Sequence, residues 1–247
     1  MDRLSNHVST ILRTVIRFVR LSHPTINLSE HRVGQIWLQI KKETANPKIL
    51  EIGPGERSRT WGLTNSQYCN LKKAIISIDL KLYPEIHVQG DAHNLPFKTN
   101  TFNFVICQAV LEHVYNSERV VKEIYRVLRP NGLVYAEVPF LQPFHAAPFD
   151  YRRYTDVGLR TLFSDFEIQE VGICGGPVST LNWILLEFVG LVFANYYLAS
   201  MVKNFLNWIL YPLINLDKYL SRKQEARKLA SCFYIIAKKV GTVPGCV

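Results

Sequence analysis

The chain has 247 residues, of which 48% are hydrophobic, and its formal net charge is +9. This length and apolar content suit one α/β domain with additions better than two independent cores. The positive charge indicates an acidic partner or an anionic surface, so nucleic acid and anionic lipid are the two candidates. The cysteines are scattered, without a Cys-x-x-Cys pair or histidines at metal-ligand spacing, which argues against a disulfide framework and against structural zinc.

The N-terminal segment, residues 1–25, has no apolar stretch followed by a cleavage site, so we expect a cytoplasmic protein without a secretory signal. Residues 4–20 instead show helical periodicity, with arginines among the apolar residues. This basic amphipathic helix either packs on the domain or lies against a membrane or a partner, and the pattern leaves both open. A second helix is predicted to begin after Ser29, as its N-terminal cap, and to end at about Glu43.

Three short apolar strands follow, and each is succeeded by glycine or aspartate. Residues 48–52 precede Gly53 and Gly55, residues 74–78 precede Asp79, and residues 87–90 precede Asp91. Glycine lets the chain turn sharply and exposes backbone N–H groups to a ligand. A carboxylate after the second strand can accept both hydrogen bonds of a ribose diol, and one after the third can accept from the amine of an adenine. Each aspartate alone is more simply a turn former, but their order predicts a nucleotide site.

The remaining elements continue an alternating pattern. Helices are predicted at residues 117–128, capped by Asn116, and at residues 156–163, capped by Thr155. Strands are predicted at residues 133–138, 166–171 and 232–238. Strands that alternate with helices give a largely parallel sheet with helices on both faces, so the predicted fold class is α/β.

Several motifs between about residues 48 and 138 resemble those of class I S-adenosylmethionine-dependent methyltransferases of the type 11 kind. They are Glu51-Ile52-Gly53-Pro54-Gly55, Asp79, Gly90-Asp91-Ala92, Leu95-Pro96-Phe97, Phe102-Asn103-Phe104-Val105, Leu111-Glu112-His113-Val114 and Leu128-Arg129-Pro130-Asn131-Gly132. The resemblance implies S-adenosylmethionine as cofactor and a Rossmann-like, doubly wound sheet of seven strands with an antiparallel last strand. It implies that the glycine turn faces the methionine part, and that the second-strand and third-strand acids bind ribose and adenine. The cofactor residues it implies are Glu51, Gly53, Pro54, Gly55, Asp79, Leu80, Asp91, Ala92 and Gln108.

The segment after the glycine turn departs from the family's pattern. Arg57 stands where the family commonly has a third glycine, and residues 56–62 are polar and poorly periodic, so we expect the cofactor helix to be short or displaced. A nicotinamide-dependent dehydrogenase is the competing class for such a turn. Its fingerprint requires Gly or Ala where Ser58 lies, and it does not predict the Leu-Pro-Phe motif.

An apolar stretch interrupts the pattern before the last strand, since the only charged residues between Glu170 and Asp217 are Glu187 and Lys203. Residues 181–201 are long enough to cross a bilayer, but flanking strands in one sheet require the chain to turn back. We expect either monotopic membrane attachment, aided by the basic residues that follow, or a helical cap or dimer interface. The predicted parts are an amphipathic helix (1–25), a methyltransferase core (26–178), an apolar helical insert (179–230), and the last strand with its tail (231–247).

A further strand is expected before Gln108 as the fourth of the sheet. Two histidines follow this strand and the fifth one (residues 133–138), where open α/β sheets bind ligands. Methyl transfer to a hydroxyl needs a base, and the reference pKa of histidine suits that role, so His113 and His145 are the candidates. Asp150 is predicted to orient the ring of His145. Tyr151, Arg152 and Arg153 are the candidates for acceptor binding; the alternatives are a surface ion pair for the arginines and a packing role for His113. The run that contains these residues resembles methyltransferase-like proteins of bacterial glycan and envelope pathways.

The sequence therefore predicts an enzyme that methylates oxygen on a lipid-linked, glycan or small amphiphilic acceptor, as a peripheral or monotopic protein at the membrane. Two alternatives from other classes are open. An RNA methyltransferase would explain the basic charge, although no aromatic–basic recognition module is evident. A non-catalytic S-adenosylmethionine-binding scaffold would explain the absence of a diagnostic acceptor motif. No metal site is predicted, and the oligomeric state is left open.

Overall fold

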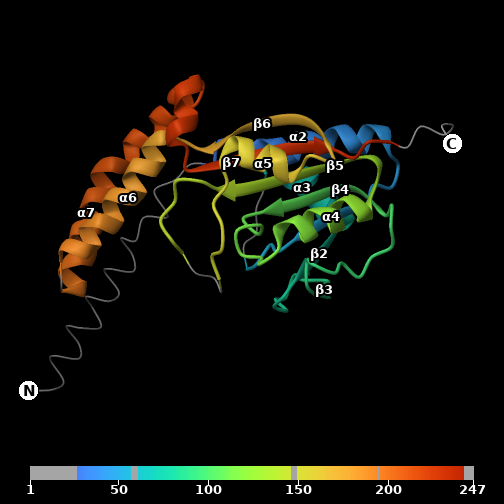
Figure 1. The fold of residues 1–247 in the computed structure, drawn as a ribbon, viewed down its shortest axis with the longest axis horizontal. Coiled ribbons are helices and arrows are strands. Elements are labelled where there is room, and N and C mark those ends of the chain that lie inside the picture. Colours follow the sequence, from blue (N-terminus) through green and yellow to red (C-terminus); the bar gives the residue numbers. More distant parts are fainter. Residues whose placement is uncertain (1–26, 57–60, 146–148, 194, 242–247) are drawn as a thin grey trace, which may run out of the picture. The chain divides into compact units, whose positions relative to one another are not determined.

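The computed structural model describes residues 27–56, 61–145, 149–193 and 195–241. The described residues form two compact units, which we call the core unit (residues 27–174 and from 230 on) and the helical unit (residues 175–229) (Figure 1). The predicted N-terminal helix of residues 1–25 lies outside the described residues, as do Arg57 and Ser58.

A seven-stranded sheet runs through the core unit in the order β3-β2-β1-β4-β5-β7-β6. The strands are β1 (Ile49–Ile52), β2 (Ile75–Asp79), β3 (Val88–Gln89), β4 (Phe102–Gln108), β5 (Leu128–Pro139), β6 (Glu167–Gly175) and β7 (Cys232–Lys238). The first five strands pair in parallel, whereas β7 runs antiparallel to β5. The predicted fold class, with its mostly parallel sheet and antiparallel last strand, is confirmed.

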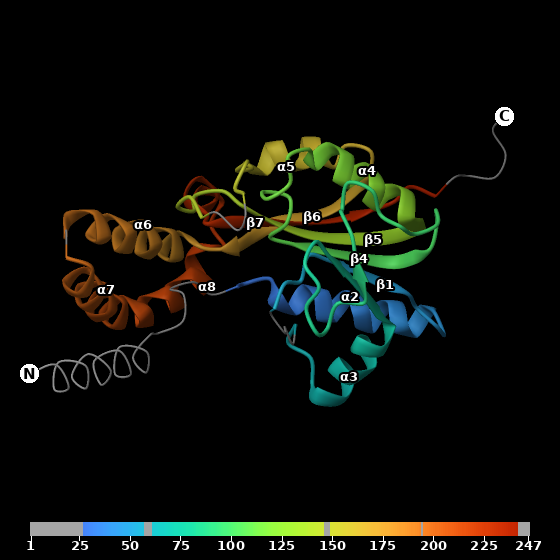
Figure 2. The ribbon, with the colours of Figure 1, turned by 90° about the horizontal axis from the view of Figure 1, so that it is seen from below.

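Helices cover both faces of this sheet. They are α2 (Glu30–Glu43), α3 (Asn65–Ala74), α4 (Ser117–Val127) and α5 (Asp156–Leu162). Figure 2 shows α2 and α3 on one face and α4 with α5 on the other. The side chains of Asn116 and Thr155 accept hydrogen bonds from backbone N–H groups in the first turns of α4 and α5, so both predicted caps are confirmed.

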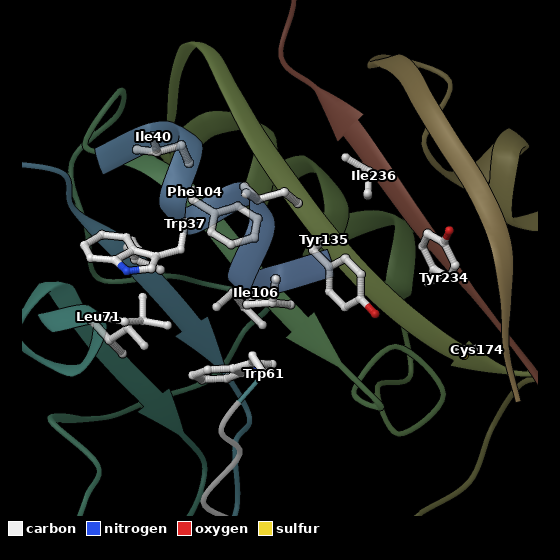
Figure 3. Packing of buried hydrophobic residues seen from close by; sticks show 14 residues of the cluster. Trp37, Ile40, Trp61, Leu71, Phe104, Ile106, Tyr135, Cys174, Tyr234 and Ile236 are labelled. Carbon is white, nitrogen blue, oxygen red and sulfur yellow. The ribbon is translucent and has the colours of Figure 1, made fainter. Parts of the chain in front are cut away.

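The face under α2 holds an apolar core cluster. Trp37 and Ile40 of α2 pack there with Phe104, Tyr135 and Ile236, which come from β4, β5 and β7 (Figure 3). The strand residues share this face because successive side chains of a strand point to opposite sides. Burying one side chain of this size contributes about 1.5–3 kcal/mol, so the cluster fixes the sheet on which the site is built.

Ser29 precedes α2 as predicted, but its side chain does not cap the helix. The hydroxyl donates to Asn27 Oδ1 at 2.9 Å and accepts from the Tyr135 hydroxyl at 2.9 Å. A buried hydroxyl needs such partners, and Glu137 joins the same network through Asn27 and Tyr135. The limits of the predicted helix are therefore right. The predicted capping bond is wrong, because the Ser29 hydroxyl bonds Asn27 and Tyr135 instead.

The first helix that the structure describes after β1 is α3, which begins only at Asn65. Thr64 and Gln67 form a capping box at its start, in which each side chain bonds the backbone N–H of the other. Trp61 and Gly62 precede it with φ values of +49° and +68°, which marks a turn. This late start agrees with the expected displacement of the cofactor helix.

The helical unit contains α6 (Pro177–Val192), α7 (Tyr196–Leu210), the 3-10 helix η1 (Tyr211–Leu216), α8 (Asp217–Leu220) and the 3-10 helix η2 (Gln224–Leu229). α6 and α7 lie side by side as a helical hairpin in Figures 1 and 2. The apolar run of residues 181–201 is thus divided between two helices, so the chain turns back as predicted. Within the described residues, none of the helices combines the length and the apolar character needed to traverse a bilayer.

Asp217 of α8 caps α6 within this unit. Its fully buried carboxylate accepts from two backbone N–H groups of the first turn of α6, at 2.8 and 2.9 Å, and from the Ser179 hydroxyl at 2.7 Å. A Cβ added to Gly176 would lie 2.3 Å from Asp217 Cγ, so this close approach requires glycine. The Thr180 hydroxyl donates to the carbonyl of Leu229 at 2.7 Å. The first turn of α6 is therefore bound to the last residue of the helical unit.

Candidate functional site

The candidate site lies at the carboxyl edge of the sheet, beyond β1, β2 and β4. Ile52 pairs with Ile78 on one side and with Cys107 on the other, so the segments that follow these strands begin close together. Gly53 follows β1 with φ +62°, and a Cβ there would lie 2.6 Å from Val110 Cγ2. Both the backbone conformation and the contact therefore require glycine.

The carboxylate of Asp79 closes the glycine turn from the end of β2. Its Oδ2 accepts from the Gly55 N–H at 3.0 Å, and its Oδ1 accepts from the Lys81 N–H at 3.0 Å. Gly55 also has φ +62°, and a Cβ there would meet no atom within 4 Å, so open space borders the turn. A carboxylate and bare peptide are thus held together where a ribose diol is expected.

Asp91 follows β3 and is held by His93. Its Oδ1 accepts from the His93 N–H at 2.9 Å and lies 2.6 Å from His93 Nδ1. Because His93 Nε2 accepts from the Asn116 N–H at 3.3 Å, the proton of the neutral ring lies on Nδ1 and is donated to Asp91. The ring stacks on Tyr115, with centroids 4.2 Å apart. Partial burial acts to raise the pKa of Asp91, but the bonds from His93 and the charge of Arg119 lower it.

A cavity of about 560 Å³ connects these groups, within the size range of small-molecule sites. Six of the predicted cofactor residues line it, together with apolar side chains such as Val110: they are Gly53, Gly55, Asp79, Leu80, Asp91 and Ala92. Glu51 and Pro54 instead line a neighbouring cavity of about 540 Å³. Gln108 is buried and accepts from the Trp61 indole N–H at 3.0 Å. The residues of the first cavity fit an adenosine, since two carboxylates face a space bordered by glycine and apolar side chains.

His113 lines the same cavity and meets His145, with the rings edge to face and their centroids 5.4 Å apart. His113 Nδ1 lies 2.5 Å from the carbonyl oxygen of Phe149, which can only accept, so the neutral ring has its lone pair on Nε2. Glu112 is 1% exposed, and its Oε1 lies 3.9 Å from His113 Nε2. Burial raises the pKa of Glu112 to about 8.

Asp150 positions His145 in a different way from the one predicted. Asp150 Oδ2 accepts from the backbone N–H of His145 at 2.9 Å but lies 3.8 Å from its Nδ1. That nitrogen contacts the carbonyl oxygen of Pro143 at 3.2 Å instead. Arg153 forms an ion pair with Asp150 and lowers the pKa of that carboxyl to about 2. Asp150 therefore orients the backbone of the loop and not the ring.

The other residues predicted to bind the acceptor separate into two groups. Tyr151 is half exposed and lines the cavity, and its backbone N–H donates to the carbonyl of Glu112 at 2.7 Å. Arg152 instead donates to Ser117 at 2.5 Å and to Glu118 at 3.1 Å, which fixes it at the start of α4. For both Arg152 and Arg153 the structure thus shows the alternative to acceptor binding, which is an ion pair.

No role was predicted for His93, Tyr115 or Glu112. His93 lies two residues after Asp91, a spacing at which a side chain can bond back to the aspartate. This spacing could have predicted the bond between them. Glu112 stands beside a candidate base in a motif noted for its resemblance alone. The stacking of Tyr115 on His93 joins distant segments, and no local pattern indicates it.

Residues 50–136, from β1 into β5, match the model of a family described as a methyltransferase domain. Demethylmenaquinone methyltransferase from Streptomyces avermitilis is 26% identical over 141 residues, which are 54% of this chain and 61% of that protein. Sterol 24-C-methyltransferase from Schizosaccharomyces pombe is 36% identical over 76 residues, or 29% of this chain and 19% of that protein. A solved S-adenosylmethionine-dependent methyltransferase from Methanosarcina mazei is 14% identical, with 82% of this chain and 97% of that chain covered and a TM-score of 0.45.

The chain spans about three fifths of the first relative and about one fifth of the second. The matched residues contain the glycine turn, Asp79, Asp91 and His113. The predicted family, and with it the expected cofactor S-adenosylmethionine, is confirmed by this match. Over residues 50–136 the chain therefore has a domain that matches the class I S-adenosylmethionine-dependent methyltransferases.

Proposed function

We propose that the protein transfers a methyl group from S-adenosylmethionine to a hydroxyl oxygen of a lipophilic acceptor at a membrane surface. The position of His113 carries this proposal. Its ring lines the cavity that contains Asp79 and Asp91, and it also lies against His145. A candidate base therefore stands beside the cofactor site, where the proton of an acceptor hydroxyl would have to be removed.

On the cofactor side, the proposed role of the chain is to bind and orient. Asp79 would accept from the ribose hydroxyls, Asp91 from the adenine amine, and Leu80 and Ala92 would pack against the adenosine. When bound, the cofactor supplies an electrophilic methyl group on a sulfonium. The carboxylates are already placed by backbone N–H groups of Gly55, Lys81 and His93, so little reorganisation accompanies binding.

On the acceptor side, His113 and His145 are the proposed bases. The lone pair on His113 Nε2 would take the proton of the acceptor hydroxyl. The nearby carboxyl of Glu112, 3.9 Å from that nitrogen, would stabilise the resulting imidazolium when it is ionised. The pair of Asp150 and Arg153 holds the loop of His145 in place.

A lipophilic acceptor is supported by two observations. The relatives named above are, by name, a demethylmenaquinone and a sterol methyltransferase, so a quinone and a sterol are their acceptors. In this chain, Phe149 and Tyr151 line the cavity and are 59% and 50% exposed, which offers aromatic surface at its opening. Apolar surface at a binding site favours an apolar ligand.

The helical unit supports a location at the membrane. Exposed apolar side chains recur every three or four residues along both helices: Leu181, Ile184, Phe188 and Leu191 in α6, and Tyr197, Met201, Phe205 and Trp208 in α7. Exposed apolar surface of this extent marks an interaction site. Lys218, Arg222 and Lys223 follow in the same unit and suit anionic headgroups. We therefore propose an anionic bilayer surface as the partner of this unit.

The activity is tested by incubating the protein with tritiated S-adenosylmethionine and lipid extract, polysaccharide or RNA. We expect label in the lipid fraction and none in RNA. Label in RNA alone would make the protein an RNA methyltransferase. Cofactor binding by calorimetry without transfer to any fraction would make it a scaffold, and either result would overturn the proposal.

The membrane contact is tested by sedimentation with vesicles of phosphatidylglycerol and phosphatidylcholine. Phe188→Asp and Phe205→Asp place charge in the two apolar stripes and should each weaken binding about tenfold or more. Val157→Asp, on α5 of the core unit, changes a side chain of equal character that is 72% exposed and should have no effect. Equal sedimentation of all four proteins, the unchanged one included, would contradict a membrane role for the helical unit.

A further inference from the structure

We propose that Glu112, His113 and His145 bind a divalent first-row transition metal ion, with Zn²⁺ as the best match. Each residue offers one ligand atom, and these atoms all lie within 4.8 Å of one another. Two imidazoles and one carboxylate form a donor set that Zn²⁺ and Fe²⁺ commonly use in enzymes, whereas Mg²⁺ and Ca²⁺ prefer oxygen ligands alone. The donor set thus decides the class of ion.

Glu112 gives the strongest indication of a missing partner. Its side chain is 1% exposed, and among the described residues its Oε2 has no hydrogen-bond partner. A buried carboxylate oxygen without a partner is costly, and native proteins rarely keep one. His113 lies on the side of the other oxygen, with Nε2 at 3.9 Å from Oε1, too far for a hydrogen bond. A cation bound by Nε2 and by both carboxylate oxygens would give Oε2 the partner that it lacks.

The histidines are oriented as metal ligands usually are. His113 Nδ1 donates to the carbonyl of Phe149 at 2.5 Å, and His145 Nδ1 contacts the carbonyl of Pro143 at 3.2 Å. Because a carbonyl can only accept, both neutral rings have the proton on Nδ1 and the lone pair on Nε2. Ligating histidines typically donate the other ring N–H to a backbone carbonyl in this way, which fixes the ring and its tautomer.

The support around the site is also built into the fold. Arg153 donates to the same Pro143 carbonyl at 3.2 Å, and its partner Asp150 accepts from the His145 N–H at 2.9 Å. Zinc–nitrogen and zinc–oxygen bonds of about 2.0–2.2 Å would bring the ligand atoms to roughly 3.5 Å from one another. The three side chains would therefore approach by about 1 Å through small rotations.

The ion would lie next to the cofactor cavity, because His113 lines that cavity. Three protein ligands leave at least one coordination position open, as in catalytic zinc sites. If the proposed function holds, on which this step rests, the acceptor hydroxyl fills that position. With the ion bound, His113 and His145 would serve as ligands and no longer as bases. Coordination would hold the oxygen and lower its pKa, so that its proton leaves to water.

The test uses the full chain, stripped with a chelator and titrated with Co²⁺, whose visible absorption reports low-symmetry nitrogen and oxygen coordination. We expect one ion per chain, displaced by Zn²⁺. Glu112→Gln and His145→Asn should each weaken binding about a hundredfold or more. His31→Asn removes an exposed imidazole of α2 outside the cluster and should bind as the unchanged protein does.

Circular dichroism of each variant checks that the fold is kept. Absence of Co²⁺ and Zn²⁺ binding to the unchanged protein would overturn the inference whatever the variants do. Equal binding by folded Glu112→Gln and His145→Asn would also overturn it, because the ion would then lie elsewhere. Calorimetry with S-adenosylmethionine on the same preparations separates the two proposals, since zinc binding without cofactor binding would refute only the proposed function.

Discussion

The carboxylates on the two sides of the candidate site are satisfied in opposite ways. On the cofactor side, Asp79 and Asp91 accept backbone N–H groups and are placed before any ligand arrives. On the acceptor side, Glu112 is buried, and its Oε2 has no partner in the part of the chain that the structure describes. The first arrangement recognises a polar ligand with little rearrangement. In the second arrangement, the buried carboxylate is satisfied only when it binds a proton or a cation. A group that binds a proton or a metal ion in this way suits a catalytic site.

The largest effect on activity is expected from a substitution on the acceptor side of the site alone. His145→Ala should lower turnover by roughly a hundredfold or more, because it removes a proposed base or metal ligand. The cofactor dissociation constant should stay nearly unchanged, since Asp79 and Asp91 belong to the other side. Single-turnover kinetics and calorimetry measure the two quantities. A loss of cofactor affinity as large as the loss of turnover would show that the two sides are not independent.

A substitution on the cofactor side should instead weaken cofactor binding and largely keep turnover. Asp79→Asn removes the charge that holds Gly55 and would accept the ribose hydroxyls, at a cost of about 2 kcal/mol, or roughly thirtyfold in the dissociation constant. Turnover at saturating cofactor should change much less. Asp165→Asn changes an exposed aspartate of the same unit and serves as the control. The comparison fails if Asp79→Asn binds cofactor as tightly as the control.

A smaller effect sharpens the comparison within the cofactor side. His93→Ala removes the imidazole that bonds Asp91 and stacks on Tyr115, so cofactor binding should weaken by about fivefold, or 1 kcal/mol. If His93 acts through Asp91, the double variant with Asp91→Asn should lose less than the sum of the two single losses. Additive losses would assign His93 to packing alone.

Local sequence signals were enough for the elements that depend on periodicity and capping. The limits of α4 follow from Asn116, and the limits of β7 match the prediction, because apolar spacing and side-chain caps act over a few residues. The cofactor acids were found in the same way, since each follows a strand whose end must lie at one edge of the sheet.

Contacts between distant segments were not predictable in this way. Arg152 and Arg153 looked available for an acceptor, yet Glu118 and Asp150 neutralise them, and Glu118 lies far away along the chain. The pairing of His113 with His145 depends on how two loops from different strands meet. The bond of the Ser29 hydroxyl to Tyr135 has the same origin. Short-range patterns identify candidate residues. Tertiary packing determines which of these side chains remain able to bind a ligand.

Thr180 bonds to Leu229, and Asp217 caps α6 beside this bond. The chain therefore enters and leaves the helical unit at neighbouring points. A segment anchored in this way can be exchanged during evolution without lengthening the connection between the strands before and after it. This segment can therefore be replaced as one piece while the sheet keeps its strands.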